Sequence, residues 1–125
     1  MTKILIADDE PNMRVLLKQT LEELEGEGVE LLVADNGVDA LNYIKIERPE
    51  LAVLDAKMPG INGYEVCDTV KNKLDMKDIY LLMLTAKSRE FDKQKGKDVG
   101  IDFYMTKPFD PDELLKKAIE VLGIA

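Results

Sequence analysis

Short apolar runs alternate along the chain with longer segments whose apolar positions recur every three or four residues. The short runs are rich in Leu, Ile and Val and are bounded by polar or turn-forming residues. Such runs are typical of strands that are buried on both faces of a parallel sheet. We therefore predict five strands, at residues 3–8, 29–34, 51–55, 79–85 and 102–106.

The segments between these runs have the periodicity of amphipathic helices. The first extends from about Met13 to near Gly26 or Gly28. The last has the strongest start signals, because Asp110 is suited to cap a helix whose first position is Pro111 and whose third is Glu113. The remaining helices are expected at residues 38–47, 64–73 and 88–99.

Strand and helix alternate five times without a repeat or a low-complexity linker. This order predicts an α/β fold in which a doubly wound five-stranded parallel sheet has helices on both faces. The common strand order for such a flavodoxin-like (βα)5 fold is 2-1-3-4-5, and ligands bind at its carboxyl edge. A length of 125 residues fits one domain spanning residues 1–125.

The amino-acid composition argues against several classes of function. The chain has 25 acidic and 17 basic residues and a net charge of -8, which argues against direct contact with nucleic acid or an anionic membrane. With a single cysteine, Cys67, and no histidine, thiolate and imidazole metal sites and histidine-based catalysis are excluded. The lone cysteine and the lack of a signal peptide or apolar membrane span predict a cytoplasmic protein.

Several residues with reactive or charged side chains follow the ends of the predicted strands. The first strand ends at Asp8 and Asp9, and the third ends at Asp55 before a Met58-Pro59-Gly60 turn. The fourth and fifth strands deliver Thr85 and Lys107 to the same edge. Neighbouring carboxylates repel one another, and Mg²⁺ with a lysine is a suitable compensation. Such a set is suited to handling a phosphoryl group, with an aspartate as nucleophile.

Four motifs in this order resemble the receiver domain of two-component response regulators over essentially the whole chain. They are "ILIADDEP", "LAVLDAKMPGINGYE", "LLMLTA" and "DFYMTKPF". The resemblance implies that Asp55 accepts a phosphoryl group from a histidine kinase or phosphotransfer protein in a Mg²⁺-dependent reaction. It also implies a stand-alone regulator or one receiver of a longer protein, acting as a monomer or a phosphorylation-dependent dimer.

The resemblance also assigns roles to individual residues. It implies Mg²⁺ ligation by Asp8, Asp9, Asp55 and the main-chain carbonyl of Lys57. Lys107 would contact the phosphoryl group, Thr85 would move to hydrogen-bond it, and Tyr104 would be the aromatic side chain that changes rotamer. The fourth helix, fifth strand and fifth helix would then present the signal to a downstream protein. A cis peptide between Lys107 and Pro108 is expected on the same basis.

Other interpretations compete with this one. A flavin carrier shares the fold, but the Asp8-Asp9-Glu10 segment repels phosphate where such a carrier needs a phosphate-binding loop. An aspartate-nucleophile Mg²⁺-dependent phosphatase is the runner-up, and a pseudo-receiver that binds without being phosphorylated is a third reading. Considered alone, Asp9 is equally suited to cap the first helix.

Overall fold

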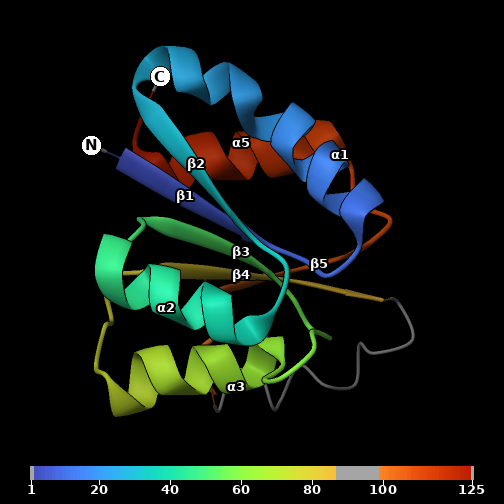
Figure 1. The fold of residues 1–125 in the computed structure, drawn as a ribbon. Helices are drawn as coiled ribbons and strands as arrows, with labels where there is room; N and C mark the ends of the chain where they lie inside the picture. Colours follow the sequence, from blue (N-terminus) through green and yellow to red (C-terminus); the bar gives the residue numbers. More distant parts are fainter. Residues whose placement is uncertain (1, 87–98, 125) are drawn as a thin grey trace.

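In a computed structural model that describes residues 2–86 and 99–124, the chain forms one five-stranded, all-parallel sheet with the order β2-β1-β3-β4-β5 (Figure 1). This confirms the predicted fold class and strand order. The strands are β1 (Thr2–Ala7), β2 (Val29–Ala34), β3 (Leu51–Asp55), β4 (Tyr80–Ala86) and β5 (Phe103–Lys107). The α-helices are α1 (Pro11–Leu21), α2 (Gly37–Glu47), α3 (Gly63–Asp68) and α5 (Pro111–Leu122). None of these helices is long and apolar enough to cross a membrane.

The helices cover both faces of the sheet. In Figure 1, α1 and α5 lie on one side of the strands, and α2 and α3 lie on the other. Each layer has its own buried cluster: Leu17 and Leu114 belong to one, and Ile44 and Val66 to the other. Every residue of β3 is buried, because the central strand is covered from both sides. This explains why its sequence is an unbroken apolar run.

Parallel pairing brings the carboxyl ends of the strands to one edge. Asp55, the last residue of β3, pairs in register with Leu84 of β4. One position further along, Thr85 pairs with Thr106, and Ala86 pairs with Lys107. The side chains at the ends of β3, β4 and β5 are therefore held at nearly the same height by the backbone ladder.

The first predicted helix changes geometry before its end. After Leu21 the chain continues as a 3-10 helix, η1 (Glu22–Glu27), which ends at Gly28 with a φ of 82°. This segment contains four glutamates and Gly26. Like charges three or four residues apart and a glycine both destabilise an α-helix. The tighter turn at the end of the helix follows from them.

The predicted helix at 64–73 also has two parts. It begins with a capping box, in which Asn62 and Glu65 exchange side-chain hydrogen bonds with each other's main chain, and becomes a π-helix, η2 (Thr69–Lys73). The wider turn carries Lys71, which is 7% exposed and donates to Asp102 at 2.9 Å. The helix predicted at 88–99 lies outside the described residues except for its last position.

Candidate functional site

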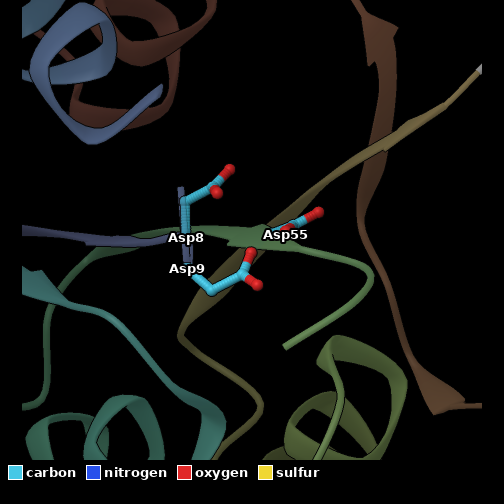
Figure 2. A group of neighbouring side chains, drawn as sticks. All are labelled: Asp8, Asp9 and Asp55. Atoms are coloured by element: carbon cyan, nitrogen blue, oxygen red, sulfur yellow. The ribbon is translucent and has the colours of Figure 1, made fainter. Parts of the chain in front are cut away.

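Three carboxylates converge at the carboxyl edge of the sheet. Asp8 and Asp9 follow directly after β1, and Asp55 ends the neighbouring strand β3. One oxygen from each lies within 4.8 Å of the other two. In Figure 2 the three side chains lie beside one another where the ribbons of β1 and β3 end. The structure therefore brings together the three acidic residues that the sequence indicated.

Asp8 is the most firmly held of the three. It is completely buried, and its Oδ1 accepts a hydrogen bond from the Glu10 N–H at 2.9 Å. Its Oδ2 accepts from the Lys107 ammonium group at 2.8 Å. Its own N–H donates to the carbonyl of Ala34 at 3.2 Å. Both carboxylate oxygens of Asp8 are thus engaged by this chain.

Asp9 has a different environment. It is exposed, and in the described part of the chain its carboxylate makes no hydrogen bond. The helix-cap reading of Asp9 is wrong, because the residue at the N-cap of α1 is Glu10 and no side chain caps this helix. The Asp9 carboxylate is therefore available to a ligand.

Asp55 is buried but open to the surface on one side. Its side chain is 10% exposed, and Lys107 Nζ lies 3.2 Å from Oδ1. The Lys57 N–H makes a long 3.4 Å hydrogen bond to the same oxygen. Burial and the nearby charge of Asp8 raise the pKa of Asp55 to about 6, against the opposing effect of Lys107. Without a further cation, the folded protein therefore disfavours the charged form of the Asp55 carboxylate.

Lys107 is the cation that compensates this cluster in the described structure. It ends β5 and contacts both Asp8 and Asp55. Burial lowers its pKa, but the hydrogen bond to Asp8 and the charges of both carboxylates outweigh burial and raise the pKa above its ordinary value. The peptide bond that follows, to Pro108, is cis, as expected.

An open hollow of about 340 Å³ lies beside these groups. Asp55 and Asp9 line it together with Lys107, and Ala86 and Lys57 form part of its wall. Asp8 does not line it. A small anion such as a phosphoryl group therefore has access to Asp55 from the surface, whereas the carboxylate of Asp8 is enclosed.

Thr85 and Tyr104 lie on the same face of β4 and β5. Thr85 pairs with Thr106, which is two positions beyond Tyr104 on β5. Thr85 is 3% exposed, and its hydroxyl has no hydrogen-bond partner in the described part of the chain. Tyr104 is half-buried and packs against the cluster under α2 and α3. A buried hydroxyl without a partner carries a free-energy cost that a new acceptor would remove.

The donor set fits a hard divalent cation. Such ions prefer carboxylate, carbonyl and water oxygens, and Mg²⁺ retains several waters while taking few protein ligands. The oxygens of Asp8, Asp9 and Asp55 lie close enough together to share one ion. Lys57, whose carbonyl was predicted as a further ligand, is two residues past Asp55 at the wall of the hollow.

One further residue, Arg14, contacts this group and was not indicated by the sequence. The Arg14 guanidinium donates from Nη1 to the main-chain carbonyl of Asp8 at 2.9 Å. In the sequence Arg14 is an ordinary polar position of an amphipathic helix. Its spacing from Glu10 was the only available signal, because it places Arg14 one helical turn past the start of α1.

Comparison with known proteins gives a consistent result. A response regulator receiver domain profile matches residues 4–119. The alkaline phosphatase synthesis transcriptional regulatory protein PhoP of Bacillus subtilis is 42% identical over 120 residues, which are 96% of this chain and 48% of that protein. The chain thus spans about half the length of the curated relatives it matches.

Solved structures agree with this assignment. A putative response regulator from Chloroflexus aurantiacus J-10-fl superposes with a TM-score of 0.83 at 32% identity, covering 98% of each chain. Chemotaxis protein CheY4 of Vibrio cholerae gives 0.82 at 33% identity over 97% of this chain and 98% of that one. The chain therefore belongs to the response regulator receiver domain family of two-component systems.

Proposed function

We propose that Asp55 is a phosphoacceptor that takes a phosphoryl group from the phosphohistidine of a sensor histidine kinase or phosphotransfer protein, in a reaction that requires Mg²⁺. One observation carries the proposal: three carboxylates meet within 4.8 Å at the carboxyl edge of the sheet, with Lys107 bound to two of them. Of these three carboxylates, only Asp55 is both buried at the end of a strand and open to the hollow.

The arrangement of the residues supports the following transfer. A carboxylate oxygen of Asp55 forms a bond to phosphorus while the phosphorus–nitrogen bond to the donor imidazole breaks. The imidazole leaves with the electron pair of that bond. Lys107, already 3.2 Å from Asp55, is suited to pair with the incoming phosphoryl oxygens. When bound, Mg²⁺ supplies further positive charge that stabilises the transferring group.

The ligands proposed for Mg²⁺ are Asp8, Asp9, Asp55 and the carbonyl of Lys57. We expect unequal contributions. Asp9 is exposed and without a hydrogen bond among the described residues, so it can ligate without giving up an existing partner. Both oxygens of Asp8 already accept hydrogen bonds, which favours contact through a water.

The phosphatase alternative is less well supported. In an enzyme of that type the nucleophile would belong to an Asp-x-Asp motif of the first strand, whereas this chain has the adjacent residues Asp8 and Asp9 there. Here Asp8 has a side chain that is 1% exposed and is bound to Lys107, and it does not line the hollow. Asp55, unlike Asp8, lines the hollow and is open to a phosphoryl group. The pseudo-receiver alternative is also less well supported, because such a protein need not keep the site residues. All five are present in this chain: Asp8, Asp9, Asp55, Thr85 and Lys107.

For signal output we propose that Thr85 turns its hydroxyl toward the phosphoryl group and that Tyr104 moves into the space that this frees. The buried, unpartnered hydroxyl of Thr85 supports this step, because phosphorylation would provide its missing acceptor. The altered surface would comprise residues 87–107 and α5, and a downstream protein would recognise it. Part of that surface, residues 87–98, lies outside the described residues.

We propose further that residues 1–125 act as one receiver unit in the cytoplasm, as a monomer or a phosphorylation-dependent dimer, without touching nucleic acid themselves. The net charge of -8 supports the last point. The single cysteine, Cys67, is buried as a free thiol, which suits a reducing compartment.

Intact-mass measurement after incubation with acetyl phosphate tests the proposal. We expect the mass of one phosphoryl group to be added in the presence of Mg²⁺ and none after chelation. The Asp55→Asn variant should stay unlabelled, whereas Asp78→Asn, which removes an exposed carboxylate far from the cluster, should label like the parent. Equal labelling of Asp55→Asn, or labelling that ignores Mg²⁺, would contradict the proposal.

A further inference from the structure

Arg14 is bound to the peptide that joins the two acidic residues after β1. Its Nη1 donates to the main-chain oxygen of Asp8 at 2.9 Å. This oxygen belongs to the peptide unit between Asp8 and Asp9, and a peptide unit is planar. The bond from Arg14 therefore fixes the orientation of that whole unit, including the nitrogen that begins Asp9.

The orientation of Asp9 depends on this peptide more than that of Asp8 does. The Asp8 carboxylate is held by the Glu10 N–H and by Lys107. The Asp9 carboxylate has no hydrogen bond among the described residues, so its direction is set only by its main chain and its rotamer. A fixed peptide reduces the conformational freedom that Asp9 would lose on binding an ion.

The position of Arg14 is itself well defined. Its N–H donates to the carbonyl of Glu10 at 3.0 Å in the first turn of α1. Its side chain lines a small cleft with Asp35, Asp39 and Tyr43, yet no described carboxylate lies within 4.0 Å of the guanidinium nitrogens. Among the described residues, the main-chain oxygen of Asp8 is therefore the one hydrogen-bond acceptor of the Arg14 guanidinium.

The charge of Arg14 and its hydrogen bond have opposite effects on a bound cation. A positive charge near the cluster repels Mg²⁺ and weakens binding. A hydrogen bond that orients a ligand strengthens binding, and removal of such supporting contacts typically costs about 10- to 100-fold in metal affinity. The sign of the change in affinity after removal of Arg14 therefore shows which effect dominates.

We propose that Arg14 is a positioning residue for the cation site: by fixing the Asp8–Asp9 peptide, it raises the affinity of the acidic cluster for Mg²⁺. This inference rests on the proposed Mg²⁺-dependent function, and it concerns a residue that does not itself ligate the ion. It also assigns the first turn of α1 a role in building the site.

Calorimetric titration of the full chain with Mg²⁺, without any phosphodonor, tests the inference. The Arg14→Met variant keeps an unbranched side chain of similar length and should bind Mg²⁺ about 10-fold or more weakly than the parent. Lys18→Met is the matched control, because it removes the same charge one turn further along α1 from an exposed residue. It should bind as well as the parent or slightly better.

Arg14→Lys provides the second variant, because it retains the charge and one donor and should recover part of the lost affinity. In the metal-free proteins, the amide resonance of Asp9 should shift in Arg14→Met and not in Lys18→Met. Equal or tighter Mg²⁺ binding by Arg14→Met overturns the inference, as does an equal loss in both methionine variants. If the parent itself binds no Mg²⁺, the proposed function fails, which is a distinguishable result.

Discussion

The ammonium group of Lys107 lies 3.2 Å from the carboxylate of Asp55, which it reaches across the intervening strand β4. The same nitrogen lies 2.8 Å from Asp8, whose side chain is 1% exposed. One lysine thus balances two buried negative charges. A site built in this way has an excess of negative charge, and it gains from any further cation that enters.

Removal of the Lys107 ammonium group should reveal this excess of negative charge. We predict that Lys107→Met lowers the free energy of unfolding by about 3 kcal/mol, because it leaves buried carboxylates uncompensated. Millimolar Mg²⁺ should then stabilise the variant more than the parent, as it replaces the lost charge. Denaturant unfolding with and without Mg²⁺ measures both effects, with Lys117→Met as control. A variant as stable as the parent in the absence of Mg²⁺ would contradict this account.

The raised pKa of Asp55 predicts a pH-dependent stability of the metal-free protein. Because its pKa is higher in the folded state, protonation of Asp55 stabilises the fold, and this stabilisation is complete below pH 3.8 and is lost as the pH rises through about 6. The shift corresponds to about 3 kcal/mol at most. We therefore expect Asp55→Asn to be more stable than the parent at pH 7.5, with the difference shrinking toward pH 4.

Denaturant midpoints of the parent and Asp55→Asn, measured across this range with a chelator present, test the sign. A variant that is less stable than the parent at pH 7.5, or a difference that grows as the pH falls, would show that burial does not disfavour the charged form of Asp55.

The hydroxyl of Thr85 predicts a separation of stability from signalling. Thr85→Val replaces a buried, unpartnered hydroxyl with a methyl group of similar size, and should raise the free energy of unfolding by about 1 kcal/mol. The same variant should lose the response of β5 to phosphorylation. Amide exchange of residues 103–107, with and without a phosphoryl mimic and Mg²⁺, measures this response. A response that persists in Thr85→Val would exclude the hydroxyl from the output step.

Gly63 is predicted to be essential to the shape of the site. A Cβ atom at this position would overlap the main-chain oxygen of Asp55 and lie 2.9 Å from the sulfur of Met83. We expect Gly63→Ala to destabilise the fold by about 2 kcal/mol and to slow phosphorylation, because the end of β3 must shift. Gly26→Ala is the control, since a Cβ there meets nothing within 4 Å. Equal stability of the two variants would refute this role.

Much of the fold could be predicted from the sequence because the buried strands leave a simple pattern. β3 is apolar throughout and is buried at every position, and β2 has the bounds that were predicted. Once the strands are parallel, their carboxyl ends meet, so the proximity of Asp8, Asp9 and Asp55 follows from topology. No detailed side-chain packing is needed for that part of the prediction.

The remaining features depend on packing and could not be predicted. The change from α- to π-helical geometry at Thr69 involves one extra residue in a turn, which periodicity does not resolve. The missing partner of Thr85 and the bond from Arg14 to Asp8 each depend on which atoms lie nearby after folding. The direction of the Asp55 pKa shift likewise depends on the balance between burial and the contact with Lys107.

The residue that carries the acyl phosphate can be identified chemically. Borohydride reduces an aspartyl phosphate to homoserine, so phosphorylated protein can be reduced, digested and sequenced by tandem mass spectrometry. We predict homoserine at position 55 alone, and only in samples that were phosphorylated with Mg²⁺ present. Homoserine at position 8 or 9 would contradict it and would favour a nucleophile in the acidic pair after β1, as in the phosphatase alternative.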